Sequence, residues 1–318
     1  MSPRLLQVGP PALFLMKIPL TFLVGPTASG KSDVALPLAQ RLNAEIISID
    51  SMQIYRGMDI GTAKPSLEVR QLVPHHLIDI CDPWEQFNTA MFVELAHAKI
   101  QEIYSRGKKI LLVGGTALYI KNLLEGIFPG PSANWEIRRQ LMQKPVELLY
   151  AELGEIDPVA AQKIYAQDLR RIIRALEVYY TTGIPISTYQ KEHTPKNESY
   201  EPSFVGIAWE KSLLIDRINR RVEEMVENGL IVETQKLLGL PQPLSHTAAQ
   251  AIGYREVIAA LREPELLPKL TETIQINTRH FAKRQMTWLK RFPVAWVAAY
   301  PGVATHELLE KSCALLPH

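Results

Sequence analysis

The sequence predicts an α/β protein with a parallel β-sheet core and an inserted all-helical domain. Short apolar runs alternate with helical stretches up to Gly126, and no strand candidate lies between residues 136 and 191. Strand character returns at residues 204–209. Alternating strands and helices are typical of a parallel sheet covered by helices on both faces. We therefore divide the chain into an extension (1–16), a core in two parts (17–129 and 204–318, the second with C-terminal helices) and a helical insertion (130–203).

Each expected element follows from its local pattern. Apolar runs of strand length predict strands, and apolar residues at helical spacing predict helices. Asn88 is a favoured cap for the helix that follows it. A cluster of proline and glycine at 128–132 separates the core from the helical block. The expected strands are 18–24, 45–49, 77–80, 109–113, 204–209 and 294–298, and the expected helical stretches are 30–42, 88–106, 136–191, 212–227 and 270–291.

The first residues need a separate interpretation. Arg4 and the apolar stretch up to Met16 loosely resemble a signal peptide, but Gly9, Pro10 and Pro11 interrupt it and no small-residue cleavage site follows. We interpret this part as a non-structural extension, with Met16 as a hypothetical alternative start.

Composition sets further bounds. The 318 residues are 47% hydrophobic and carry a formal net charge of +2, so a nucleic-acid partner would need local basic patches. No run reaches the ~18 apolar residues of a membrane span, and we expect no membrane partner. Cys81 and Cys313 lie far apart without CxxC spacing, which argues against a disulfide framework or a Cys-rich zinc site. Two reduced cysteines are typical of the cytoplasm, where we expect the protein to act as a monomer.

A phosphate-binding loop stands between the first expected strand and helix. Residues 25–32 match G-x-x-x-x-G-K-[ST] in full, and ligands bind at this end of parallel strands. Backbone N–H groups of such a loop surround phosphate oxygens, a lysine adds charge, and a serine hydroxyl suits Mg²⁺. The core is therefore P-loop NTPase-like, and ATP binding, kinase chemistry and other polyphosphate chemistry all remain open at this point. The predicted phosphate-binding residues are Gly25, Pro26, Thr27, Ala28, Ser29, Gly30, Lys31 and Ser32, with Ser32 as the Mg²⁺ ligand.

A long polar segment follows the second expected strand, and its first residue is Asp50. By position alone, this carboxylate could assist Mg²⁺ as in other phosphate-loop proteins, or it could cap a helix.

Five motifs taken together resemble the tRNA dimethylallyltransferase (tRNA isopentenyltransferase) family. They are the phosphate loop, residues 49–65, 74–77, 113–116 and 279–291, and the resemblance extends from about residue 20 to residue 292. It implies transfer of a dimethylallyl group from dimethylallyl diphosphate to N6 of adenosine at tRNA position 37, with release of diphosphate. The extension before Met16 and the absence of the zinc finger of eukaryotic relatives depart from the pattern.

The resemblance also assigns roles. Asp50 would be the general base for the adenine amine, and Thr116 would lie near the reacting base; without the family, Thr116 could equally cap a helix. Lys31, the loop amides and Mg²⁺ would stabilise the leaving diphosphate. Helical spacing puts Arg217 on one face with Arg220 and Arg221, and we expect Arg217 or Arg221 to reach the diphosphate.

Basic and polar stretches along the chain match the family's RNA contacts, with the anticodon stem-loop as the expected partner. Without the resemblance, most of these charges would be solvated helix faces. We interpret Trp288 as a core residue, and His75 and His76 as structural rather than metal ligands, since no acidic partner is near them in sequence. The expected tRNA contacts are Asp50, Ser51, Met52, Gln53, Thr116, Arg138, Gln167, Asp168, Leu169, Arg170, Arg171, Gln250, Ala251, Ile252, Gly253, Tyr254, Arg255, Lys283 and Arg284.

Three alternatives stay open from the residues alone. The same fold could prenylate free adenine nucleotides, the loop could serve a small-molecule kinase, or the chain could be a non-catalytic RNA-binding protein that senses nucleotides. The basic helical insertion favours tRNA as the substrate over a free nucleotide.

Overall fold

The structure is a computed structural model that describes residues 17–127, 130–192 and 199–317. Its contacts divide the chain into two compact units. The first unit combines residues up to 124 with those from 198 onward, and the second comprises residues 125–197. The expected extension at 1–16 lies outside the described residues.

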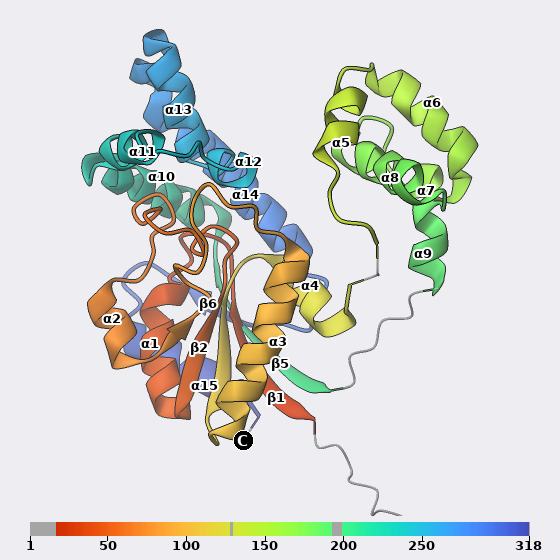
Figure 1. The fold of residues 1–318 in the computed structure, drawn as a ribbon. Coiled ribbons are helices and arrows are strands. Elements are labelled where there is room, and N and C mark those ends of the chain that lie inside the picture. Colours follow the sequence, from red (N-terminus) through yellow and green to blue (C-terminus); the bar gives the residue numbers. More distant parts are fainter. Residues whose placement is uncertain (1–16, 128–129, 193–198, 318) are drawn as a thin grey trace, which may run out of the picture. The chain divides into compact units, whose positions relative to one another are not determined.

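A six-stranded parallel sheet forms the centre of the first unit, as the sequence predicts (Figure 1). The strand order is β3-β2-β4-β1-β5-β6. β1 lies between β4 and β5, which explains why its sequence is almost continuously apolar. The strands are β1 (Ile18–Val24), β2 (Ala44–Ile49), β3 (His75–His76), β4 (Lys109–Gly114), β5 (Tyr200–Trp209) and β6 (Ala295–Ala299).

Helices cover both faces of this sheet. Figure 1 shows α3 in front of the strands and α15 behind them, and α15 shares an apolar cluster with α1. Asn88 caps α3 as predicted, because its side chain accepts hydrogen bonds from the N–H groups of Ala90 and Met91. The helices of this unit are α1 (Lys31–Leu42), α2 (Leu67–Leu72), α3 (Thr89–Ser105), α4 (Ala117–Glu125), α10 (Lys211–Glu227), α11 (Leu230–Leu238), α12 (His246–Ala249), α13 (Tyr254–Arg262), the 3-10 helix η1 (Pro264–Lys269), α14 (Leu270–Leu289) and α15 (Thr305–Ala314).

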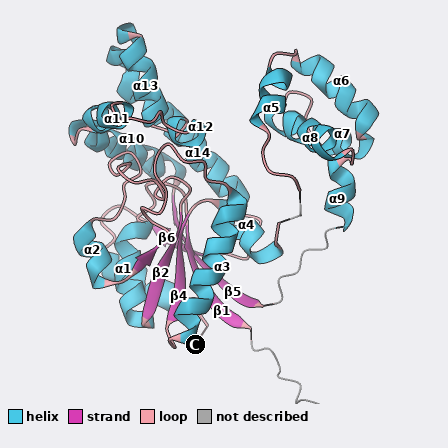
Figure 2. Ribbon diagram, in the orientation of Figure 1, coloured by secondary structure: helices cyan, strands magenta, loops and turns pink. Residues whose placement is uncertain are grey.

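The second unit is helical throughout its regular elements, as Figure 2 shows by colour. Its central helix is α8, whose apolar face packs Ile172 and Leu176 against Leu149 and Leu153 of α6. These side chains are almost fully buried, so the unit has a core of its own. Its helices are α5 (Trp135–Met142), α6 (Val146–Ile156), α7 (Pro158–Lys163), α8 (Leu169–Thr182) and α9 (Ile186–Glu192).

Three expectations about local structure are wrong. The strand expected at 77–80 is instead β3 at His75–His76, because Leu77 and Asp79 take left-handed backbone conformations with φ of 60° and 55°. β5 begins at Tyr200 rather than at 204, so the boundary expected at 203 would cut this strand. Trp288 is 36% exposed and therefore not a core residue.

Candidate functional site

The phosphate loop follows β1 at the carboxyl edge of the sheet, and its backbone requires small residues. A Cβ at Gly25 would lie 2.8 Å from Ser29 Oγ and 2.9 Å from the Ile207 carbonyl oxygen. Ala28 and Gly30 have positive φ values of 62° and 87°, which bend the chain into the start of α1. The sequence motif therefore adopts a curled loop before a helix N-terminus, as expected.

Several amides of this loop are left for a ligand. Among the described residues, no hydrogen-bond acceptor is recorded for the backbone N–H groups of Ala28, Gly30, Lys31 and Ser32. Such amides at a helix N-terminus attract anions, and the helix dipole adds to the attraction. The loop is thus suited to a phosphate or diphosphate group.

Side chains from β5 and α10 hold the outside of the loop. Trp209 Nε1 donates to the Ser29 carbonyl oxygen at 2.9 Å, and Arg217 Nε donates to the Ala28 carbonyl oxygen at 2.9 Å. The Arg217 guanidinium lies 4.2 Å from the centre of the Trp209 ring. Because Arg217 is engaged by the loop backbone and by an aromatic face, it fixes the loop while remaining close to any bound anion.

Arg221 has fewer partners than Arg217. Its Nε is buried and has no hydrogen-bond partner among the described residues. Burial lowers the pKa of Arg221, and the nearby carboxylates of Asp50 and Asp33 oppose this shift. A buried guanidinium without a hydrogen-bonded partner is costly, and an anionic ligand in the phosphate loop would satisfy it.

Lys31 lies in the same electrostatic environment. Burial and the charge of Arg221 lower the pKa of Lys31 to about 8, although the charge of Asp50 raises it. Its Nζ donates to the Pro26 carbonyl oxygen at 2.8 Å. The positive charges of Lys31 and Arg221 thus repel each other beside the phosphate loop, and a bound diphosphate would relieve this repulsion.

Asp50 directly follows β2, and its carboxylate orders the next turn. Oδ1 accepts hydrogen bonds from the N–H groups of Met52 at 2.8 Å and Gln53 at 3.4 Å. The segment after it is not helical, so the helix-cap interpretation of Asp50 is wrong. Among the described residues, the hydrogen bonds of this turn involve Oδ1 alone, and the charge of Asp50 raises the pKa of both Lys31 and Arg221.

Thr116 joins the Asp50 turn from the neighbouring strand. Its Oγ1 accepts a hydrogen bond from the N–H of Ser51 at 3.3 Å. The two strand ends approach closely, because a Cβ at Gly114 would lie 2.7 Å from the Ile49 carbonyl oxygen. The structure thus brings Asp50 and Thr116 together, as the sequence predicts.

The segment after Asp50 is anchored by Lys64 and Glu233, and neither role was expected from the sequence. Lys64, whose side chain is 2% exposed, donates to the Tyr55 carbonyl oxygen and to the carboxylates of Asp59 and Asp79. Glu233 of α11 accepts hydrogen bonds from the N–H groups of Ile60 and Gly61. For Glu233 the only available signal was a charged residue in a helical stretch, which more often indicates a solvated surface.

The expected tRNA contacts of the first unit separate into buried and exposed residues. Tyr254 is fully buried, and its hydroxyl donates to Glu233 and accepts from the N–H of Gly61. Ala251 and Gly253 are also buried, whereas Gln250 is exposed and Ile252 and Arg255 are half-buried. Tyr254 therefore supports the loop after Asp50, and within the stretch 250–255 only Gln250 is exposed.

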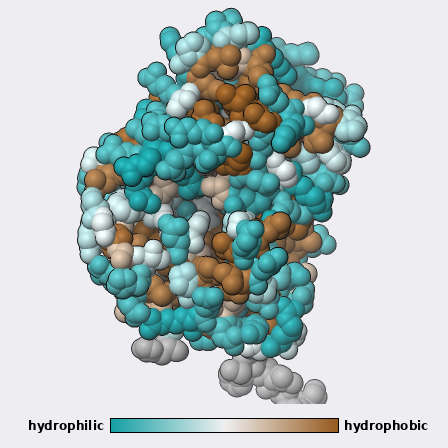
Figure 3. All heavy atoms as spheres, turned by 90° about the vertical axis from the view of Figure 1, so that its left-hand side faces the viewer, coloured by the Kyte–Doolittle hydropathy of each residue, from teal (hydrophilic) through white to brown (hydrophobic). Residues whose placement is uncertain are grey.

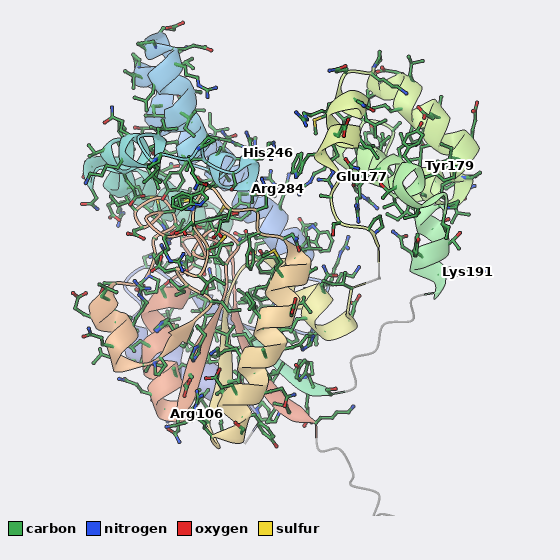
Figure 4. The ribbon with its side chains drawn as sticks, in the orientation of Figure 1. Arg106, Glu177, Tyr179, Lys191, His246 and Arg284 are labelled. Carbon is green, nitrogen blue, oxygen red and sulfur yellow. The ribbon has the colours of Figure 1, made fainter. Side chains whose placement is uncertain are left out.

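Basic residues in the C-terminal half of α14 line an open hollow at the surface. It is lined by His280, Lys283, Arg284, Thr287 and Trp288. Arg284 is labelled in Figure 4. The Arg291 guanidinium lies 4.3 Å from the centre of the Trp288 ring. An exposed aromatic ring beside several cations is the combination that binds nucleic-acid bases and phosphates.

The expected tRNA contacts of the second unit are likewise mixed. Asp168 caps α8 through the N–H of Arg171, whereas the side chains of Gln167, Leu169, Arg170 and Arg171 are exposed. Arg138 is not a freely solvated arginine, because Nε and Nη2 each donate to the Glu177 carboxylate at 2.9 Å. Glu177, labelled in Figure 4, is fully buried.

Both residues of the His75–His76 pair make contacts within the fold, and one of the two has an acidic partner. His76 Nε2 lies 2.7 Å from Glu45 Oε2, which also accepts a hydrogen bond from Arg106. In the part of the chain that the structure describes, no three acidic, histidine or cysteine side chains are grouped to hold a metal ion. Ser32 is exposed at the start of α1, so its hydroxyl is accessible.

The molecular surface carries both polar and apolar side chains. Figure 3 shows one face that is largely hydrophilic, with apolar side chains in separate patches. Across the described residues, the structure contains no helix that is both long and apolar enough to cross a lipid bilayer.

Comparisons with known sequences identify a family. A family model described as IPP transferase matches residues 53–292. The chain is 46% identical over 294 residues to tRNA dimethylallyltransferase 2 of Geotalea uraniireducens, covering 91% of this chain and 95% of that protein. It is also 46% identical over 291 residues to tRNA dimethylallyltransferase of Geobacter metallireducens, covering 90% and 94%.

Solved structures agree with these matches. The full-length tRNA isopentenylpyrophosphate transferase of Bacillus halodurans has 40% identity and a TM-score of 0.67, with 94% of this chain and 96% of that chain covered. A eukaryotic dimethylallyltransferase acting on tRNA has 28% identity and a TM-score of 0.75, with 90% and 75% covered.

Proposed function

We propose, from the premise that this chain belongs to the IPP transferase family, that it transfers a dimethylallyl group from dimethylallyl diphosphate to an adenosine of tRNA. These matches confirm the family that the motifs predicted. More specifically, we propose N6 of adenosine at position 37, beside the anticodon, as the acceptor.

One observation carries the chemical part of this proposal. The phosphate loop and the Asp50–Thr116 pair lie at the same edge of the sheet, because β2, β4 and β1 are neighbours in parallel register. The charge of Asp50 raises the pKa of both Lys31 and Arg221, which supports a carboxylate within electrostatic range of the cations that would bind diphosphate. An anion site beside a carboxylate base is the arrangement that prenyl transfer to an amine requires.

The reaction follows from these groups. The adenine amine is a weak nucleophile because its lone pair is delocalised into the ring. As its nitrogen forms a bond to the first carbon of the dimethylallyl group, the bond from that carbon to the diphosphate oxygen breaks. Asp50 accepts the proton lost by the amine, and the loop amides, Lys31 and Arg221 stabilise the negative charge on the departing diphosphate.

A magnesium ion fits the donors around the loop. The exposed Ser32 hydroxyl is a hard oxygen ligand at the start of α1. Because the described residues offer no complete metal-binding group, we expect Mg²⁺ to be held jointly by Ser32 and diphosphate oxygens, as is usual for this ion. When bound, it would supply further charge stabilisation to the leaving group.

RNA would be held by exposed cations on each unit. Lys283 and Arg284 on α14 and Arg170 and Arg171 on α8 are the exposed cations of the expected set. We propose that these residues contact the anticodon stem-loop, whose target base must leave its stack to reach Asp50. The protein is expected to act on this partner as a monomer in the cytoplasm.

The decisive experiment combines substrate choice with matched variants. The protein is incubated with Mg²⁺, radiolabelled dimethylallyl diphosphate and unmodified tRNA, and a parallel reaction contains AMP in place of tRNA. Label in tRNA that is lost with Asp50→Ala is the expected result. Label only in AMP would overturn the tRNA substrate, and release of the γ-phosphate from ATP without any label transfer would indicate a kinase.

A second measurement assigns the diphosphate contact. Arg221→Gln should weaken binding of inorganic diphosphate by roughly 10- to 100-fold, because a hydrogen bond to a charged group is lost. Arg220→Gln is the matched control, since Arg220 is exposed on the same helix. Equal effects of the two substitutions would contradict the role given to Arg221.

A further inference from the structure

Gln285 is a buried polar residue of α14, and its amide joins two loops of the candidate site. The residue is 8% exposed. Its Oε1 accepts a hydrogen bond from the N–H of Thr27 at 2.8 Å, and its Nε2 donates to the Gly115 carbonyl oxygen at 3.3 Å. Thr27 belongs to the phosphate loop, and Gly115 immediately precedes Thr116. One side chain therefore connects the diphosphate site to the turn that lies beside Asp50.

The surroundings are shaped to receive this amide. A Cβ at Gly115 would lie 2.3 Å from Gln285 Nε2, so that a side chain there would displace the glutamine. Ala282, three residues earlier on α14, packs with Ala28 of the phosphate loop in a small apolar cluster. Packing and two hydrogen bonds thus fix Gln285 against both loops.

The residues of α14 just before Gln285 are cationic and exposed to solvent. Lys283 and Arg284 are exposed and line the basic hollow, whereas Gln285 points inward to the backbone of the two loops. Because Gln285 is only 8% exposed and both ends of its amide are hydrogen-bonded to loop backbone, the side chain is held toward the two loops and not toward solvent. Gln285 links the Thr27 N–H to the Gly115 carbonyl oxygen through its side-chain amide.

We propose that Gln285 is a positioning residue for prenyl transfer. It directs the Thr27 N–H away from the anion, which leaves the amides from Ala28 to Ser32 to surround the diphosphate. It also sets the separation between this loop and Thr116, and hence between the leaving group and the acceptor amine. This inference rests on the proposed function, because it assigns the residue that aligns the two reactants.

Two substitutions and a matched control test the proposal. Gln285→Met has a similar length but removes both hydrogen bonds, and Gln285→Glu keeps an acceptor for Thr27 but faces the Gly115 carbonyl oxygen with a carboxylate. Gln275→Met is the control, because Gln275 is a hydrogen-bonded glutamine of α14 that contacts Asn219 and Glu223 instead of the site. All three proteins are compared with the unsubstituted chain for melting temperature, RNA binding, diphosphate binding and turnover.

Misplacing reacting groups by about 1 Å can reduce turnover by roughly 100-fold. We expect kcat of Gln285→Met to fall by roughly 10- to 100-fold, with weaker thermal stabilisation by inorganic diphosphate and an unchanged KM for RNA. Gln275→Met should match the unsubstituted chain. If Gln285→Met does not fold, Gln285→Glu provides the test, because it retains the shorter hydrogen bond and must still show a lower kcat than the control.

The outcomes separate this inference from the proposed function. If the unsubstituted chain transfers no label to RNA, the proposed function fails, while loss of diphosphate stabilisation in Gln285→Met would still support a role in shaping the loop. If the chain is active and Gln285→Met retains the kcat of the control, or loses only RNA affinity, the positioning role is refuted.

Discussion

Replacement of Glu177 by glutamine should loosen the helical unit selectively. The Glu177 carboxylate is fully buried and accepts four hydrogen bonds. Oε1 accepts from the Asn134 N–H and from Arg138 Nε, and Oε2 accepts from Arg138 Nη2 and Arg174 Nη1. A glutamine amide can keep the first pair through its oxygen, but its NH₂ group would then face two arginine donors.

The magnitude follows from this geometry. Breaking a buried ion pair from one side typically costs about 3–5 kcal/mol, because the remaining charge is left uncompensated. The side chains of Arg138 and Arg174 are 23% and 30% exposed, so both can turn partly toward water. We therefore expect the lower end of the range, about 3 kcal/mol, which corresponds to a roughly 100-fold change in an opening equilibrium.

Hydrogen exchange measured by mass spectrometry is the suitable assay, because it reports on α8 separately from the sheet. Amides of α8 should exchange roughly 100-fold faster in Glu177→Gln, while those of β1 and β4 should be unaffected. Glu155→Gln is the matched control, an exposed glutamate of α6 in the same unit. Equal protection of α8 in the two variants would refute the reasoning.

The same carboxylate predicts a pH dependence. Burial alone would raise the pKa of Glu177, but hydrogen bonds from Arg138 and Arg174 outweigh it, and the pKa lies below the ordinary value of 4.5. Its stabilising effect is therefore fully present above pH 4.5 and is lost as the pH falls through the lower folded-state pKa. Protection of α8 should decrease in that acidic range, and Glu177→Gln should show a weaker dependence.

Four further predictions concern the site. Because the pKa of Lys31 is about 8, the side chain loses its positive charge above that pH, and affinity for inorganic diphosphate should decline. Calorimetric titrations at several pH values should show this decline in the unsubstituted chain and not in Lys31→Met. Asp50→Asn should reduce kcat by roughly 10²- to 10⁴-fold without loss of diphosphate binding, since it removes only the proton acceptor; retention of full turnover would exclude Asp50 as the base. Glu233→Gln should lower the free energy of unfolding by about 1–3 kcal/mol in urea titrations, because the backbone N–H groups of Ile60 and Gly61 lose a charged acceptor. EDTA should abolish label transfer and added Mg²⁺ should restore it, whereas turnover unaffected by the chelator would argue against a metal at Ser32.

The parts of the site that the sequence predicts are those encoded locally. The phosphate loop is a contiguous motif between a strand and a helix, and Asp50 directly follows an apolar run. Parallel strands bring their carboxyl ends to one edge, so that the meeting of Asp50 and Thr116 also follows from the alternating pattern. No knowledge of distant contacts is needed for these conclusions.

The supporting residues could not be predicted in the same way. Gln285 and Glu233 lie in helical stretches, where a polar residue normally faces solvent, and their partners are far away in sequence. Only the folded arrangement shows that each one binds the backbone of a site loop. The same limitation applies to Tyr254, which the family pattern suggests as an RNA contact and which the structure buries beneath the loop.

Two errors in the expected strands have a local physical origin. Leu77 and Asp79 read as part of an extended apolar run, but their left-handed backbone ends β3 after two residues. The first residues of β5 include Glu201 and Pro202, which are unusual in a central strand, yet they pair in register with Pro19 and Leu20 of β1. Tertiary pairing therefore overrides weak local preference at this point.

The central position of β1 has a consequence for the newly made chain. Ile18 of β1 pairs with Tyr200 of β5, so one edge of the innermost strand stays open until the whole helical unit has left the ribosome. At 5–20 residues per second this interval lasts roughly 10–40 seconds. An unpaired apolar edge invites association with other chains during that time. The helical unit, whose contacts are local, can fold before β5 emerges, and we expect the nascent chain to depend on chaperones until the sheet closes.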